Sequence, residues 1–169
     1  MFLIVPNLID LKMCSSLIDT HQKNINLVRK WRNTHPLLCK PSKEIENIFT
    51  RFFPHQYVQR MEIVKWPTNS FQAKHYDEDQ IGGDSSGLAS ITYLNDDYEG
   101  GQTCIVDEKL CVNPKIGTTF FFDGKKYEHE VKPITDGIRY TLALWYSNDP
   151  NCRMDNHVNV DRHCGVYSV

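Results

Sequence analysis

His75 and Asp77 are the first residues of this chain whose types and spacing suggest chemistry. Side chains two positions apart on an extended chain point to the same side, so this imidazole and this carboxylate can bind one metal ion together. His129, on a distant segment, would add a third ligand. Two neutral imidazoles and one carboxylate occupy one face of a six-coordinate ion, an arrangement typical of non-haem iron(II) sites, and leave positions open for substrates.

Arg139 follows His129 by ten positions, and the run between them reads as two strands joined by the turn Thr135 to Gly137. If that loop has three residues with Gly137 left-handed, His129 faces Ala143 across a hairpin. Side-chain alternation then places on the His129 face Arg139, Thr141, Ala143 and Trp145, and on the opposite, apolar face Tyr140, Leu142, Leu144 and Tyr146. A two-residue turn would invert this assignment.

A buried arginine is costly unless it meets an anion, and its planar fork suits a carboxylate held by two hydrogen bonds. With Arg139 on the face of His129, the metal ligands and a cation share one cavity. The sequence therefore predicts that this cavity binds a carboxylate ligand beside the metal.

Several further motifs follow the ligand pair in a fixed order. They are His75-Tyr76-Asp77, Tyr93-Leu94-Asn95, Gly100-Gly101-Gln102-Thr103, His129-Glu130-Val131-Lys132-Pro133-Ile134, Gly137-Ile138-Arg139 and Trp145. In this order the chain resembles the 2-oxoglutarate-dependent iron(II) oxygenases and, within them, the prolyl 4-hydroxylase-like family. The opening strand and helix also look like the start of that family's catalytic domains, so the resemblance spans most of the chain.

The resemblance implies a set of site residues and cofactors. Iron(II) would be bound by His75, Asp77 and His129, and Arg139 would bind the distal carboxylate of 2-oxoglutarate. The cosubstrate pocket would also include Tyr93, Thr103 and Trp145. Dioxygen is the other cosubstrate, and ascorbate is a further requirement in relatives.

The chain departs from the family at Trp66. The family usually has a tyrosine nine residues before the first iron ligand, and this chain has Trp66 there. An indole donates one hydrogen bond and accepts none, and it is bulkier than a phenol. The geometry of the cosubstrate on that side is therefore expected to differ.

The composition predicts one domain over residues 1–169 that is soluble and cytoplasmic. With 169 residues and a net charge of −2 from interspersed acids and bases, the chain has no basic stripe for nucleic acid. Met1 to Val5 is too short and lacks the basic flank of a signal peptide, and no apolar run approaches the roughly 20 residues of a membrane helix. The six cysteines are interpreted as free thiols, with Cys104 and Cys111 as cross-strand neighbours that a bridge could join.

The element pattern predicts a mainly β protein with flanking N-terminal helices, built as a double-stranded β-helix (jelly roll). A strand over Phe2 to Val5 precedes helical support over about 9–53, with helices at Ile9 to Trp31 and Ser42 to Phe53 that cover the Leu142 and Leu144 side. His21 and His35 are expected to be solvated. The β core covers about 57–147, and an irregular tail covers 148–169.

Two polar segments have open interpretations. The loop from Glu78 to Gly87 follows the ligand pair, so it is either a lid over the site or a plain connection. In the tail, potential soft ligands occur at Cys152, His157, His163 and Cys164, but their spacing matches no usual zinc finger.

The interpretation that these features favour is a 2-oxoglutarate- and iron(II)-dependent dioxygenase acting on a proline-containing peptide or protein, with prolyl 4-hydroxylase as first choice. Lysyl hydroxylase is the alternative within the class, because of Arg139 and the turn from Asp97 to Gly101. A nucleic-acid demethylase of this superfamily would carry a second arginine where this chain has Trp145. A non-enzymatic jelly-roll binding module would leave Arg139 without an anionic partner.

Overall fold

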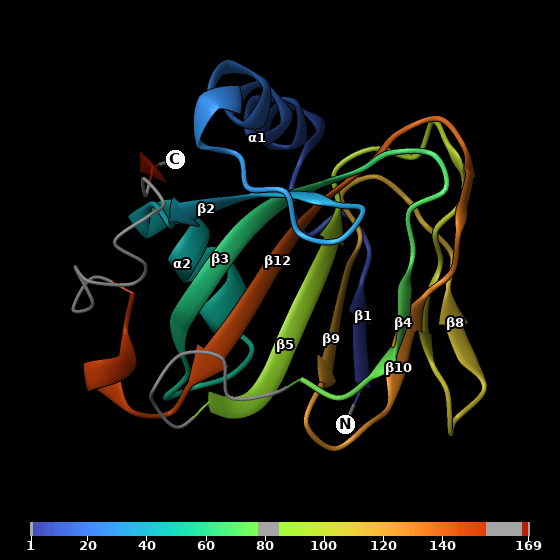
Figure 1. Ribbon diagram of the computed structural model, residues 1–169. Helices are drawn as coiled ribbons and strands as arrows, with labels where there is room; N and C mark the ends of the chain where they lie inside the picture. The colour runs from blue at the N-terminus through green and yellow to red at the C-terminus, as the bar shows by residue number, and fades with distance from the viewer. Residues whose placement is uncertain (1, 78–84, 155–166, 169) are drawn as a thin grey trace.

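The chain folds into β sheets with helices on one side (Figure 1). The computed structural model describes residues 2–77, 85–154 and 167–168. Its large sheet has seven strands in the order β1-β9-β5-β12-β3-β2-β13. These are β1 (Phe2–Val5), β9 (Thr119–Asp123), β5 (Ser85–Tyr93), β12 (Arg139–Ser147), β3 (Tyr57–Trp66), β2 (His35–Lys40) and β13 (Tyr167–Ser168).

A second sheet has four strands in the order β4-β10-β7-β8. They are β4 (Gln72–His75), β10 (His129–Val131), β7 (Thr103–Ile105) and β8 (Leu110–Val112). A two-stranded sheet pairs β6 (Glu99–Gly100) with β11 (Ile134–Asp136). In Figure 1, β4, β10 and β8 lie at the right, on the side of the molecule away from β2 and α2.

Strand β12 occupies the middle of the large sheet, between β3 and β5. Its side chains alternate between two faces, as the sequence pattern predicts. Leu142, Leu144 and Tyr146 belong to the main hydrophobic core, while Thr141, Ala143 and Trp145 line a cavity on the other face. One strand therefore separates the core from the cavity.

Two α-helices in the described part of the chain pack against the core face of the large sheet. Helix α1 (Leu11–Lys23) begins at Asp10, whose side chain accepts a hydrogen bond from the Met13 N–H, and α2 (Lys43–Thr50) begins in the same way at Ser42. Their apolar residues Cys14, Leu17, Ile45 and Phe49 share one core cluster with Leu142 and Leu144. Short 3-10 turns occur at Ile25–Leu27 (η1) and Pro150–Cys152 (η2).

The N-terminal region differs from the predicted helical support. Helix α1 ends at Lys23 rather than at Trp31, because Asn24 closes it with backbone and side-chain hydrogen bonds to the Thr20 carbonyl. The segment His35–Lys40, which lies within the predicted helical support, is strand β2, and its central residues are buried against β3. His21 is fully buried rather than solvated, since it stands seven residues after Cys14 on the buried face of α1.

The predicted hairpin between His129 and Trp145 is wrong. Strand β10 pairs with β4 and β7, and β12 pairs with β3 and β5, so the two segments lie in different sheets. Gly137 is left-handed as expected, with φ of +78°. His129 and the Trp145 face of β12 nevertheless line the same cavity, with the sheets on opposite sides of it.

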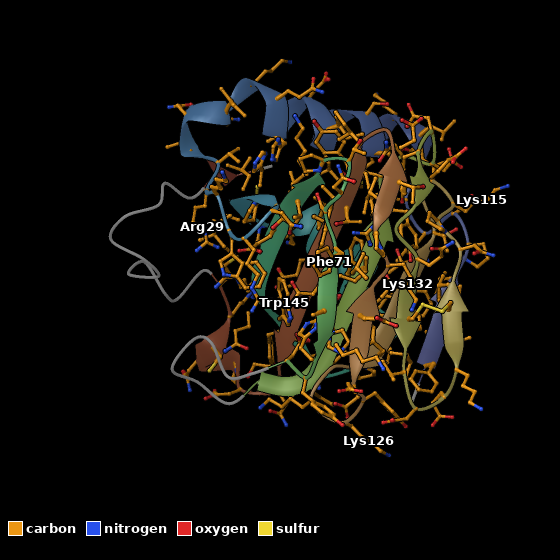
Figure 2. All side chains as sticks on the ribbon, turned by 45° about the vertical axis from the view of Figure 1, so that its right-hand side comes forward. Arg29, Phe71, Lys115, Lys126, Lys132 and Trp145 are labelled. Carbon is orange, nitrogen blue, oxygen red and sulfur yellow. A yellow bond between two sulfur atoms is a disulfide. The ribbon has the colours of Figure 1, made fainter. Side chains whose placement is uncertain are left out.

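The cysteines are not all free thiols. Cys104 and Cys111 stand opposite each other on β7 and β8 and form a disulfide (Figure 2). Among the other described cysteines, Cys14, Cys39 and Cys152 are free and buried. The expectation of free thiols is therefore wrong for this one pair.

Two segments for which the sequence left the interpretation open lie partly outside the described residues. They are the loop segment 78–84 and the tail residues 155–166, which include His157, His163 and Cys164. None of the described helices is long and apolar enough to cross a bilayer.

Candidate metal centre

His75, Asp77 and His129 come together at one end of the small sheet. His75 ends β4 and stands directly opposite His129, the first residue of β10. The Asp77 Oδ1 lies 3.9 Å from the His75 Nε2 and 3.6 Å from the His129 Nε2. Ligand atoms from all three residues lie within 4.8 Å of one another.

Both histidines have their second nitrogen hydrogen-bonded to the backbone. The His75 Nδ1 donates to the Ala73 carbonyl over 2.9 Å, and the His129 Nδ1 donates to the Tyr127 carbonyl over 3.0 Å. A carbonyl only accepts, so each Nδ1 carries a proton, and in the neutral ring each Nε2 is the nitrogen that can bind a metal ion. Such outer hydrogen bonds fix the ring orientation and the tautomer of histidines that bind metal.

Burial lowers the pKa of His75, and the neighbouring His129 ring lowers it further. A lower pKa favours the neutral imidazole, which is the form that binds a metal ion. The His129 ring is itself packed edge-on against Phe122, with ring centroids 4.8 Å apart.

The Asp77 carboxylate is positioned by contacts from two other segments. Its backbone N–H donates to the Gly124 carbonyl over 2.9 Å, and the Trp145 Nε1 donates to the Asp77 Oδ2 over 3.1 Å. A Cβ added at Gly124 would lie 2.1 Å from that same Oδ2. Residue 124 must therefore lack a side chain for the carboxylate to occupy this position.

Among the described residues, Arg139 is one of the largest fully buried side chains, and its hydrogen-bond donors are only partly satisfied. Its Nη2 donates to the Thr103 Oγ1 over 3.2 Å, but its Nε and Nη1 have no hydrogen-bond partner among the described residues. The guanidinium carbon lies 4.8 Å from the Trp66 ring and 5.4 Å from the Tyr93 ring. A buried cation with unused donors is expensive, so this group is suited to an anion that enters the site.

A cavity of about 190 Å³ extends from the three ligands between the two sheets. Strands β4 and β10 contribute His75, His129 and Val131, and Asp77 follows β4. Strands β3 and β12 contribute Val64, Trp66, Thr141, Ala143 and Trp145. Thr103 and Trp66 also line it, and Arg139 contacts both of them. Figure 2 shows Trp145 on β12 and Phe71 just before β4.

The three residues predicted for the cosubstrate pocket have different hydrogen-bond partners in the structure. Thr103 bonds Arg139, whereas Trp145 bonds the metal-ligand candidate Asp77. Tyr93 is fully buried, and its hydroxyl donates to the Val112 carbonyl over 3.3 Å.

Sequence reasoning missed two residues of this site. Gly124 makes room for Asp77, and Tyr98 has a buried hydroxyl whose hydrogen has no acceptor in the described part of the chain. The Asp123-Gly124 turn signal was visible in the sequence, but its contact with Asp77 is between segments far apart in the chain. Tyr98 stands in the predicted turn before Gly100-Gly101, and nothing in that pattern indicates burial of its hydroxyl.

The sequence profile of the 2OG-Fe(II) oxygenase superfamily matches residues 58–147, which is more than half of the chain. The chain belongs to this superfamily. The matched range includes the three ligand candidates and Arg139. The donor set fits iron(II), since two neutral imidazoles and a carboxylate are the ligands of facial non-haem iron sites.

Curated relatives of this oxygenase chain include prolyl 3-hydroxylases. Human prolyl 3-hydroxylase 2 is 34% identical over 79 residues, which cover 43% of this chain and 11% of the relative. Chicken prolyl 3-hydroxylase 1 is 33% identical over the same coverage. The chain therefore spans about a tenth of the length of these relatives.

Solved structures show the same fold. The viral collagen prolyl hydroxylase of Paramecium bursaria Chlorella virus-1 has a TM-score of 0.68 at 19% identity, covering 86% of this chain and 94% of the other. A prolyl-4-hydroxylase of Pseudomonas putida has a TM-score of 0.65 at 15% identity, covering 86% of this chain and 91% of the other.

Proposed function

We propose that this protein is a 2-oxoglutarate- and iron(II)-dependent dioxygenase that hydroxylates a prolyl residue in a peptide or protein. His75, Asp77 and His129 bind iron(II), and Arg139 binds the distal carboxylate of 2-oxoglutarate. The observation that carries the proposal is the combination of three converging ligand atoms with a buried guanidinium that has two unused donors.

Iron(II), 2-oxoglutarate and dioxygen together supply the oxidation of a C–H bond to C–OH, with conversion of 2-oxoglutarate to succinate and carbon dioxide. The chain's own residues bind and orient the reactants. His75, Asp77 and His129 would hold the metal ion beside the cavity that they line, where the reactants would bind. The distal carboxylate of 2-oxoglutarate would lie beside Thr103 and Arg139, where the guanidinium charge would complement it.

The strand arrangement supports the predicted double-stranded β-helix, and we propose that residues 1–169 form a single catalytic domain. Side chains of β12 and of the small sheet face each other and line the cavity. Trp145, directly beside Asp77, is placed to contact both the metal ligands and a substrate in that cavity.

A prolyl substrate is supported by the names of the relatives, which are prolyl hydroxylases in sequence and in fold. We place the hydroxyl group at C4 as first choice, with C3 as the alternative that the sequence relatives favour. Ascorbate belongs in the assay, as a reductant for metal oxidised in turnovers that do not reach product.

The test is a turnover assay with iron(II), 2-oxoglutarate, ascorbate and a proline-rich peptide, measuring succinate and the mass of the peptide. Wild type should release succinate and add one oxygen atom to the peptide, and His129→Ala should do neither. Fragmentation of the hydroxylated peptide separates proline from lysine, and chromatography of its hydrolysate separates C4 from C3. Succinate release by His129→Ala equal to that of wild type would remove the proposal.

Arg139→Ala tests the cosubstrate assignment. The 2-oxoglutarate concentration for half-maximal activity should rise at least tenfold, and the iron(II) requirement should change little, because the lost contact is to the carboxylate and not to the metal. Arg51→Ala, at an exposed arginine after α2, is the matched control and should behave as wild type. If both requirements shift equally in Arg139→Ala, the residue is structural.

A further inference from the structure

Three aromatic side chains surround the Arg139 guanidinium, and each carries one hydrogen that it can donate. Trp66 and Tyr93 place their rings over it, at 4.8 and 5.4 Å. Tyr98 lies beside it, since a Cβ on Gly101 would come within 2.9 Å of the Arg139 Cδ and 3.2 Å of the Tyr98 Cε2. An anion that reaches Arg139 therefore meets three possible additional donors.

Two of these donors are already used. The Trp66 Nε1 donates to the Thr141 Oγ1 over 3.1 Å, and an indole has no second donor. The Tyr93 hydroxyl donates to the Val112 carbonyl and accepts from the Thr103 N–H. Neither group can bind a new anion without losing a hydrogen bond in a buried place, which is costly.

The third donor is unused. The Tyr98 hydroxyl is buried, and its hydrogen has no acceptor among the described residues. Burial raises the pKa of Tyr98 by more than the nearby Arg139 charge lowers it, so the phenol stays protonated and remains a donor. A buried donor without an acceptor is unfavourable in the free protein and is satisfied if an acceptor enters.

Two glycines hold Tyr98 in this place. Gly101 and Gly137 are both left-handed, with φ of +67° and +78°. A Cβ on Gly137 would lie 3.0 Å from the Tyr98 Cβ and 3.1 Å from its Cα, so only glycine lets the turn approach so closely. The two chain segments thereby hold the phenol next to the guanidinium.

We propose that Tyr98 donates a hydrogen bond to the distal carboxylate of 2-oxoglutarate beside Arg139. This inference rests on the proposed function and adds a cosubstrate-binding residue to it. The carboxylate then accepts from the Arg139 Nε and Nη1 and from the Tyr98 hydroxyl, which are the donors left unused around it.

The experiment is calorimetric binding to the manganese(II)-loaded protein, which needs no turnover. Two ligands are compared: 2-oxoglutarate, and 2-oxobutyrate, which has the same metal-binding end and no distal carboxylate. In Tyr98→Phe the Kd for 2-oxoglutarate should rise about ten- to a hundredfold, the effect of one hydrogen bond to a charged group. The Kd for 2-oxobutyrate should stay as in wild type.

Tyr146→Phe is the matched control. Tyr146 has a buried hydroxyl like Tyr98, but it lies on the core face of β12, where its hydroxyl bonds the Ser90 hydroxyl. It should lower thermal stability and leave the ratio of the two Kd values unchanged.

The possible outcomes separate the two proposals. An unchanged Kd for 2-oxoglutarate in Tyr98→Phe, or equal weakening of both ligands, overturns the role of Tyr98. If wild type does not bind 2-oxoglutarate at all, or if Arg139→Ala binds it as tightly as wild type, the proposed function itself is wrong.

Discussion

At the scale of single residues, the site depends on how the Asp77 carboxylate is held. A histidine ring has few orientations once its Nδ1 is bonded to a carbonyl, as in His75 and His129. A carboxylate on a short side chain is freer. Here the Trp145 indole restrains the Asp77 carboxylate through a hydrogen bond, and the absence of a Cβ at Gly124 leaves room for it. Metal affinity should therefore respond to both neighbours, although neither is a ligand.

Gly124→Ala should weaken manganese(II) binding by roughly ten- to a hundredfold, the usual cost of disturbing a group that orients a metal ligand. The added methyl group would occupy the position of the Asp77 Oδ2. Gly124 is not among the glycines with positive φ, so its backbone conformation suits alanine. The measurement is a metal titration.

Thermal unfolding of the metal-free variant is the control for Gly124→Ala, and its midpoint should stay near that of wild type. An unchanged manganese(II) affinity in a folded variant would show that Asp77 moves aside without effect, and would count against its role as a ligand.

At the scale of elements, the sequence predicts which face a residue occupies better than which strand lies beside it. The alternation along Arg139–Ser147 is a local property, and the structure has the predicted core and cavity faces. The pairing of β10 with β12 was wrong because strand partners are set by contacts between distant segments, which a turn motif does not determine. The metal-ligand candidates were found from residue types and order, which do not depend on that pairing.

Strand β2 was missed for a related reason. His35–Lys40 contains Pro36 and follows a short irregular region, and its apolar residues Leu37, Leu38 and Cys39 have no alternation because all of them are buried. A short apolar run of this kind does not distinguish a buried strand from a buried helix segment. Strand β2 contacts the buried His21 of α1, whose Nε2 donates to the His35 carbonyl over 2.8 Å.

The contact between α1 and β2 should make the fold sensitive to acid. Burial lowers the pKa of His21 below 6.5, so the unfolded chain binds a proton that the folded chain does not. Stability should therefore fall as the pH decreases through about 6.5, by at most about 1.4 kcal/mol per pH unit for this residue. In His21→Gln, urea unfolding at pH 7.5 and 5.5 should show a smaller difference than in wild type.

His55→Gln, at an exposed histidine, is the control and should keep the wild-type pH dependence. A His21→Gln protein that loses stability between the two pH values as steeply as wild type would place the acid sensitivity elsewhere.

At the scale of the whole molecule, the candidate metal centre lies where the small sheet faces the large one. His75 and His129 come from paired strands of the small sheet, Asp77 follows β4, and Trp145 reaches Asp77 from the middle of the large sheet. An ion bound there would add a further link between β4, β10 and the segment that follows β4, beyond the hydrogen bonds already present. Ligand binding and global stability should therefore be coupled.

Manganese(II) at about a hundred times its Kd should stabilise the protein by about 2.7 kcal/mol, or raise Tm by roughly 5–10 °C for a chain of this length. Differential scanning calorimetry with and without a chelator measures the shift, and the chelator should abolish it. His129→Ala should show no shift. A shift of the same size in that variant would mean that the stabilising ion binds at another place.

Strand β12 has one further consequence, for the kinds of sequence change that the fold can accept. Its residues alternate between core and cavity from Tyr140 to Tyr146. Replacing one side chain disturbs one position, whereas inserting or deleting a single residue would exchange the two faces beyond that point and turn the guanidinium or the indole into the core. Homologous chains should therefore vary in composition along this strand while keeping its length constant.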